Sequence, residues 1–351
     1  MRRVWVWIVV VVAVLATGWT FLAWRAGMFI PHDGRWAVEP GEFTDDGFSQ
    51  EKQLITLGDT QVAYIDVGEG PPLILLHGCP FSAYEWNEII PILAQHYRVI
   101  VPDLYGLGDT PVRLDQDYRL PQDVEMVRGL MDALGISSAD FIGHDHGGAT
   151  VQLLMQADPD RIQRAILTNV EAYDQWPSEP ELPYLRMIVN PITSPLIYQA
   201  LQFEPIRREI FSIAVEDEAV LTTEVLDAYA LPHIATPERW QRLRRFFRWQ
   251  MDETHNNITM TALPGMRTFE RPVLLLWGER DENFGPHLAR RLANDIPGVS
   301  GIHYLRNSQH IPMQEEDEEY VRAALAFLRD GVVSAEAQTA LTEARSAADG
   351  S

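Results

Sequence analysis

The stretch Phe141–Thr150, FIGHDHGGAT, decides the fold. An apolar run leads into it and a helix-like run follows, which predicts a strand that turns sharply into a helix. Gly143 and Gly147 lie two residues on either side of Asp145, where a larger side chain would clash in so tight a turn. Such a frame often holds a serine at its centre, so the carboxylate indicates a different nucleophile. We expect Asp145 to adopt a positive φ, which Asp tolerates better than most residues.

The composition is that of a globular protein with an acidic surface. The 351 residues are 46% hydrophobic, enough for one large core or two smaller ones. Fifty acidic against 28 basic residues give a formal charge of -22, which argues against a nucleic-acid partner. Cys79 is the one cysteine, so the chain has no intramolecular disulfide.

The chain opens with a long uncharged segment. It runs from Val4 to Trp24 as VWVWIVVVVAVLATGWTFLAW, and a helix of that length spans ~30 Å, about the thickness of the hydrocarbon layer. We predict one N-terminal transmembrane helix over 1–25 and a linker over 26–50. The basic residues before the segment slightly outweigh those after it, which favours a membrane-anchored protein with its folded domain outside the cytoplasm. An uncleaved or atypical signal sequence is the alternative.

From residue 51 onward, short apolar runs alternate with amphipathic stretches. The first two runs alternate in polarity and fit an antiparallel edge, whereas later ones are continuously apolar, as strands buried on both faces should be. This alternation predicts a mostly parallel eight-stranded sheet with helices on both faces. The predicted strands are Gln53–Leu57, Gln61–Val67, Pro72–Leu76, Arg98–Pro102, Asp140–Gly143, Arg164–Val170, Pro272–Trp277 and Gly301–Leu305.

One segment interrupts the alternation and divides the chain. Residues 172–267 carry no strong strand pattern and consist of aromatic-rich helical pieces, which predicts a helical cap over the carboxyl edge of the sheet. The core then has two parts, 51–171 and 268–330. The remaining residues, 331–351, are rich in Ala, Ser and acids and are predicted to form a flexible tail.

Three candidate catalytic groups follow predicted strand ends. Asp145 comes first, Asp281 follows in LLLWGERDENFG, and His310 follows in NSQHIPMQEE. This order of nucleophile, acid and histidine is typical of an α/β-hydrolase triad. The helix that begins at Asp145 also stabilises its ionised form, because a helix N-terminus carries partial positive charge.

Five motifs make the resemblance specific. HGCP, PDLYGLGDT, GHDHGG, WGERD and SQHIPMQE resemble the α/β-hydrolase superfamily, and within it the haloalkane dehalogenase and epoxide hydrolase branch, which uses an aspartate nucleophile. The likeness covers about residues 53–328 in the required order. It implies that Asp145 is the nucleophile and His310 the base, with no cofactor and no metal.

The resemblance also implies the supporting groups. Asp281 would orient the histidine, and the backbone N–H groups of Cys79 and His146 would form the oxyanion hole. Glu171, which follows another predicted strand in NVEAYDQWP, is the alternative orienting acid. We favour Asp281, because WGERD is the fuller match.

A carboxylate nucleophile suits a saturated carbon. It can displace a leaving group there and become an alkyl ester of the enzyme, which water activated by His310 then hydrolyses. Each oxyanion-hole donor stabilises the tetrahedral intermediate by roughly 3–4 kcal/mol. The expected substrate is a small apolar organic molecule, with water as the second reactant.

The motifs do not identify the leaving group as clearly as they identify the nucleophile. Haloalkane dehalogenases usually carry Trp after the nucleophile, where this chain has His146, whose side chain is either a donor or structural. Dehalogenase-like activity is favoured slightly, with epoxide hydrolysis as the alternative and a non-catalytic, membrane-tethered binding module as the second alternative. The candidate pocket residues are Trp176, Tyr184, Tyr198 and Trp249.

Overall fold

The computed structural model describes residues 2–44, 47–252 and 258–349, with side-chain surroundings from residue 11 onward. Its centre is an eight-stranded sheet in the order β10-β9-β8-β7-β4-β5-β3-β2. β2, β3 and β5 pair antiparallel, and the other neighbours pair parallel. The strands are β2 (Gln53–Leu57), β3 (Thr60–Val67), β4 (Pro72–Leu76), β5 (Arg98–Pro102), β7 (Ala139–His144), β8 (Ile162–Val170), β9 (Val273–Gly278) and β10 (Val299–Leu305).

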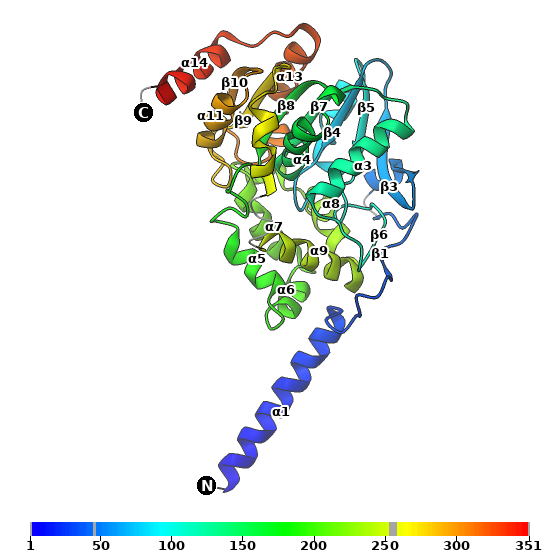
Figure 1. Ribbon diagram of the computed structural model, residues 1–351. Coiled ribbons are helices and arrows are strands. Elements are labelled where there is room, and N and C mark those ends of the chain that lie inside the picture. The colour runs from blue at the N-terminus through cyan, green and yellow to red at the C-terminus, as the bar shows by residue number, and fades with distance from the viewer. Residues whose placement is uncertain (1, 45–46, 253–257, 350–351) are drawn as a thin grey trace.

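The predicted mostly parallel sheet is confirmed, and each predicted strand agrees with an observed one to within two residues at either end. The inner strands β4, β7 and β9 are buried almost throughout, and the runs of β4 and β9 are continuously apolar, as strands buried on both faces should be. Helices cover the sheet on both faces (Figure 1). The helices of the described chain, which include those of the cap, are α1 (Arg2–Arg25), α2 (Ile90–Leu93), α3 (Leu120–Ala133), α4 (Asp145–Ala157), α5 (Leu182–Val189), α6 (Ser194–Ala200), α7 (Glu204–Phe211), α8 (Thr223–Ile234), α9 (Pro237–Gln250), α10 (Leu263–Met266), α11 (Pro286–Asp295), α12 (Pro312–Glu315), α13 (Asp317–Asp330) and α14 (Ala335–Asp349).

Between β8 and β9 the chain forms helices, with no strand among the residues described there. Helices α5 to α9 gather in one layer beyond the sheet, in the lower half of the domain in Figure 1. This layer is the predicted cap. A small two-stranded sheet of β1 (Trp36–Val38) and β6 (Val112–Arg113) lies next to α9.

The predicted membrane anchor is wrong. In the described part of the chain, no helix combines the length and the hydropathy needed to cross a membrane. α1 projects from the cap (Figure 1), and its C-terminal half packs against α6. The Trp19 indole there donates to the Ile192 carbonyl (3.1 Å). The predicted transmembrane helix, membrane partner and membrane-anchored, extracytoplasmic placement are all overturned by this finding.

The C-terminal segment also differs from its prediction as a flexible tail. Residues 335–349 form α14, which packs against α11 and β10. Its stripe of Ala337, Leu341 and Ala344 is buried, and Gly301 on β10 lets the helix approach closely, since a Cβ there would lie 3.1 Å from the Ala337 Cβ.

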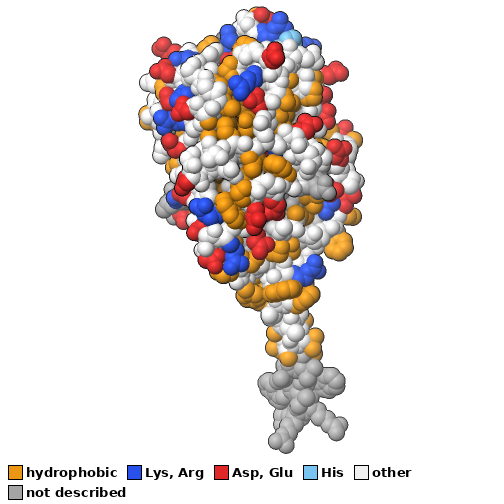
Figure 2. All heavy atoms as spheres, turned by 90° about the vertical axis from the view of Figure 1, so that its right-hand side faces the viewer, with side chains coloured by type: hydrophobic (Ala, Val, Ile, Leu, Met, Phe, Trp, Pro, Cys, Tyr) orange, Lys and Arg blue, Asp and Glu red, His pale blue; other side chains and the backbone are white. Residues whose placement is uncertain are grey.

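On the face of the molecule drawn in Figure 2, acidic, basic and hydrophobic side chains are interspersed, and no large area carries charge of one sign alone.

Candidate active site

Asp145 occupies the sharp turn between β7 and α4. Its φ is 47°, the predicted positive value. The two flanking glycines are required by close packing: a Cβ at Gly143 would lie 2.8 Å from the Gly148 Cα, and one at Gly147 would lie 2.1 Å from the Leu76 carbonyl oxygen. The local sequence therefore forces the strand to turn straight into the helix and presents Asp145 at the carboxyl edge of the sheet.

The Asp145 carboxylate faces a backbone donor and an imidazole. The Cys79 N–H donates to Oδ2 at 2.8 Å, and His310 Nε2 lies 3.8 Å from the same oxygen. Oδ1 has no hydrogen-bond partner among the described residues, although the side chain is buried. His146 follows in the first turn of α4, where backbone N–H groups lack helical partners. One carboxylate oxygen is thus held by the candidate oxyanion hole, and the other is free.

His310 is bonded to Asp281 on its other side. Its Nδ1 lies 3.0 Å from Asp281 Oδ2. Asn169 Nδ2 donates to the same oxygen (2.7 Å), while the Asn283 N–H donates to Oδ1 (2.7 Å). Burial alone would raise the pKa of Asp281, but His310 and these hydrogen bonds lower it. Burial likewise opposes the charge on His310, yet the two carboxylates raise its pKa well above the usual value.

Glu171 is engaged elsewhere. Its Oε2 lies 2.9 Å from His146 Nδ1, and His146 Nε2 lies at an ion-pair distance of 3.6 Å from Asp123 Oδ2. The three side chains are buried, and the imidazole packs edge-on against Phe246. In this arrangement the alternative acid does not reach His310, and the His146 side chain does not line the apolar pocket between the cap and the strand ends.

The buried group of Asp123, His146 and Glu171 predicts a pH-dependent stability. Burial opposes the charge on His146, but the two carboxylates raise its pKa to about 10. A raised histidine pKa stabilises the fold fully below the unfolded value of roughly 6.5, and this stabilisation is lost as the pH rises towards 10. We therefore expect the melting temperature of wild type to fall faster between pH 7 and 10 than that of the neutral variant Asp123→Asn/His146→Gln/Glu171→Gln. Parallel curves in thermal unfolding would contradict the assignment.

A second buried pair links the two loops of the site. Glu85 Oε2 accepts from the Gly78 N–H (3.0 Å), and its Oε1 lies 2.7 Å from His144 Nδ1. His144 Nε2 in turn donates to the His310 carbonyl oxygen (2.7 Å). The sequence reasoning missed Glu85, although an acid within the aromatic run AYEW was a signal of a buried, partnered carboxylate.

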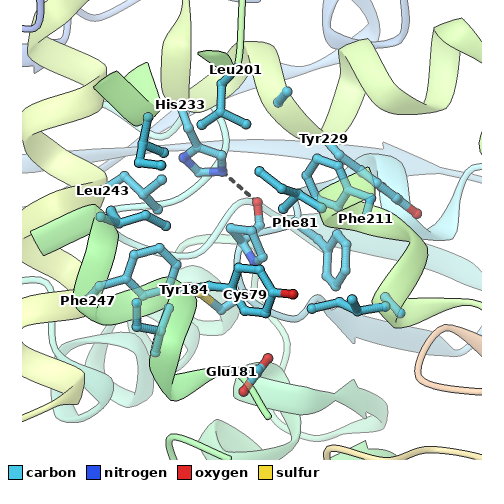
Figure 3. A pocket seen from close by; sticks show the side chains of 18 of the residues that line it. Cys79, Phe81, Glu181, Tyr184, Leu201, Phe211, Tyr229, His233, Leu243 and Phe247 are labelled. Atoms are coloured by element: carbon cyan, nitrogen blue, oxygen red, sulfur yellow. Dashed lines mark hydrogen bonds between the residues drawn. The ribbon is translucent and has the colours of Figure 1, made fainter. Parts of the chain in front are cut away.

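An apolar pocket of about 240 Å³ lies between the cap and the strand ends, and Cys79 is part of its lining (Figure 3). His310 also lines this pocket. Of the four predicted pocket residues, Trp176 and Tyr184 line it. Tyr198 and Trp249 do not, because their rings pack against other residues. Those packing partners are Trp240 for Tyr198, and Tyr118 and Arg245 for Trp249.

The indole N–H groups in the lining already donate hydrogen bonds to other side chains. Trp176 Nε1 donates to Gln250 Oε1 (2.8 Å), and Trp240 Nε1 donates to Ser194 Oγ (3.1 Å). The remaining lining is mostly apolar, with one acid among the described residues, Glu181, which the sequence reasoning did not single out. Examples of the apolar lining are Leu185, Ile188, Leu201, Ile210, Phe211 and Leu243.

The cap is tied directly to the histidine loop. The His310 N–H donates to the Ala214 carbonyl oxygen (3.1 Å) in the 3₁₀ turn η4 (Ser212–Ala214). Three lining residues are more than a third exposed, Tyr184 and Met187 on α5 and Ile213 on η4. The pocket therefore opens to solvent between α5 and η4.

Comparisons with known proteins agree with this fold. A family described as alpha/beta hydrolase fold matches residues 71–191. A haloalkane dehalogenase of Mesorhizobium japonicum is 27% identical over 272 residues, 73% of this chain and 86% of that protein. A soluble epoxide hydrolase of a Corynebacterium species is 37% identical over 121 residues, 32% of this chain and 41% of that protein. The crystal structure of an alpha/beta hydrolase fold protein from Burkholderia ambifaria, 26% identical, superposes with a TM-score of 0.65 over 78% of this chain and 99% of that one.

The chain therefore has the α/β-hydrolase fold, and its similarity to named hydrolases identifies it as an enzyme. The matches to a haloalkane dehalogenase and an epoxide hydrolase agree with the branch that the five motifs predicted. This result excludes the non-catalytic binding module.

Proposed function

We propose that the protein hydrolyses small apolar substrates at a saturated carbon through an ester of Asp145. The observation that carries the proposal is the position of this carboxylate, with Oδ2 held by the Cys79 N–H and Oδ1 unpartnered among the described residues. Oδ1 forms a bond to the substrate carbon, while the leaving group departs with the electron pair of its own bond. Asp145 becomes an alkyl ester.

The second half of the cycle uses His310. Ester formation removes the negative charge of Asp145, one of the two charges that raise the pKa of His310. The pKa of His310 therefore falls, so the ring can release its proton to solvent and act as a neutral base. It takes a proton from water, and the hydroxide attacks the ester carbonyl carbon. The N–H groups of Cys79 and His146 stabilise the resulting oxyanion. Asp281 orients the ring, and His310 returns the proton to the departing alkoxide.

The lining supports an epoxide more strongly than a haloalkane. A departing halide needs N–H donors, but the Trp176 and Trp240 indoles donate to cap residues. Asn283 is the remaining side-chain amide in the described lining, a single donor for the ion. The oxygen of an epoxide stays attached to the product, so it needs one proton donor rather than a set of N–H groups that bind an anion.

Trapping the ester tests the proposal. His310→Gln should still be alkylated but should not hydrolyse the ester, so styrene oxide or 1,2-dibromoethane is expected to leave a stable mass increment on the peptide containing Asp145. Peptide mass spectrometry measures it, with wild type as the turnover control. His303→Gln is the matched control, because His303 pairs with Glu319 outside the site and should accumulate nothing. Absence of label on Asp145 with both reagents refutes the proposal.

A further inference from the structure

Glu181 introduces a carboxyl group into an otherwise apolar pocket. It immediately precedes α5 and lies in the lining together with Cys79, Asn283 and His310. It is partly exposed, and it is the one acid among the described lining residues. Figure 3 shows its carboxyl group at the end of the pocket where Cys79 is drawn. A carboxyl group in such a place needs a chemical reason, since apolar surroundings disfavour its charge.

The contacts of Glu181 fix one oxygen and leave the other free. Ser178 Oγ donates to Oε2 at 2.7 Å, and the same hydroxyl lies 3.2 Å from Asn283 Oδ1. The Asn283 N–H donates to Asp281, so Glu181 is joined through two residues to the loop of the triad acid. Oε1 has no hydrogen-bond partner in the part of the chain that the structure describes. The free oxygen can therefore carry a proton towards a substrate.

The electrostatic surroundings favour that protonated form. Burial and the negative charge of Asp145 raise the pKa of Glu181 to about 7, against the opposing effects of the imidazole and the hydroxyl. A carboxyl group with this pKa is neutral in a large share of molecules near pH 7, and it is then a donor that does not repel Asp145. The charged and titratable groups around it are Asp145, Asp281, His310 and Cys79.

We propose that Glu181 protonates the oxygen of an epoxide as Asp145 opens the ring, which makes epoxides the substrate class. This inference rests on the proposed Asp145 ester. Asp145 Oδ1 bonds to a ring carbon, the C–O bond breaks, and its electron pair stays on the oxygen, which takes the proton from Glu181 Oε1. The products are a hydroxyalkyl ester and a Glu181 carboxylate. Hydrolysis releases the diol, and the proton of the regenerated Asp145 carboxylic acid returns to Glu181.

Tyrosines are the competing donors. Tyr198 does not line the pocket, and Tyr229 contributes its ring while its hydroxyl lies on the side of Glu85. Tyr184, which lies in the first turn of α5 three residues after Glu181, is the one exposed tyrosine in the described lining. Tyr184→Phe therefore belongs in the same experiment.

The test compares ester formation in the full-length His310→Gln protein with and without Glu181→Gln. His310→Gln removes hydrolysis of the ester and the titration of the imidazole, so quenched single-turnover mass spectrometry reports alkylation of Asp145 alone. With styrene oxide, Glu181→Gln is expected to slow labelling by about 10²–10⁴-fold. With 1,2-dibromoethane, whose bromide needs no proton, we expect a change within about threefold. The exposed neighbour Glu179 gives the matched control, Glu179→Gln, with no effect on either reagent.

The outcomes separate this inference from the proposed function. Label from both reagents at an unchanged styrene oxide rate in Glu181→Gln overturns the role of Glu181 and leaves the ester mechanism standing. A large loss in Tyr184→Phe with none in Glu181→Gln assigns the proton to the tyrosine and also overturns it. No label in the parent His310→Gln protein refutes the proposed function itself.

The pH profile keeps the inference testable if Glu181→Gln does not fold. Labelling by styrene oxide in His310→Gln should fall as Glu181 ionises, at a pH higher than the wild-type pKa of about 7, because this variant lacks the imidazole that lowers the pKa of Glu181. Ser178→Ala removes a hydrogen bond that lowers the pKa of Glu181, so the fall should move to higher pH. An unmoved profile contradicts the assignment.

Discussion

Asp145→Ala is expected to lower kcat by at least about 10⁴-fold with any substrate that the wild type hydrolyses. The methyl group cannot form an ester, whereas the oxyanion donors, the pocket and His310 stay in place, so substrate binding should persist while turnover is lost. Release of diol or halide over time, at saturating substrate, measures the effect. Ligand-induced stabilisation of the variant against heat checks that the pocket is still formed.

The matched control for this substitution is Asp140→Asn. Asp140 is buried on the same strand, β7, but at its other end, where Arg164 lies 3.8 Å away. Asp140→Asn should leave kcat within about threefold of wild type, because Asp140 contacts no group of the site. If Asp145→Ala kept more than a tenth of wild-type turnover, the nucleophile would have to be another residue.

Asp281→Asn should lower kcat by about 10⁴-fold, because an amide can hold the His310 ring in the wrong tautomer. Alkylation of Asp145 does not need the imidazole as a base, so we expect the ester to accumulate in this variant. Steady-state kcat and the mass of the Asp145 peptide, measured on the same samples, separate the two half-reactions.

Comparing Glu171→Gln with Asp281→Asn tests which of the two acids orients His310. Since Glu171 pairs with the His146 side chain, kcat should stay within about tenfold of wild type. Stability should fall by about 3–5 kcal/mol instead, because a buried imidazolium loses a carboxylate. Urea unfolding measures this change. A larger loss of kcat at Glu171 than at Asp281 would reverse the assignment of the orienting acid.

Much of the core was predictable because its signals are local. The runs of β4 and β9 are continuously apolar, and the glycines around Asp145 mark a turn that other side chains would block. In a parallel sheet, carboxyl ends meet at one edge, so chain order alone placed Asp145, Asp281 and His310 together.

The termini were not predictable in the same way. The buried stripe of α14 consists largely of alanine, whose weak hydrophobicity gives little periodic signal until β10 lies beside it. The apolar composition at the start of the chain favoured a membrane span, but it carried no information about the contact of α1 with α6.

Side-chain directions in the cap were equally out of reach. An aromatic residue on an amphipathic helix can face the pocket or a neighbouring helix, and the sequence does not distinguish Trp176 from Trp249. Glu181 was overlooked because an acid just before a helix is common for electrostatic reasons alone. The partner of Glu171 depended on the relative position of three elements, which no local pattern encodes.

The hydrogen bond from the His310 N–H to Ala214 has a consequence for substrate size. The turn that contains Ala214 also forms one side of the pocket entrance. A molecule wide enough to displace this turn would therefore also displace the backbone of His310, to which the turn is hydrogen-bonded. Alkylation of Asp145 does not use the imidazole and can tolerate such a displacement. Hydrolysis of the ester, in contrast, needs the imidazole correctly placed to activate water next to the ester carbonyl. On the proposed ester mechanism, we therefore expect bulky substrates to slow hydrolysis of the Asp145 ester rather than its formation, so that they leave the enzyme slowly.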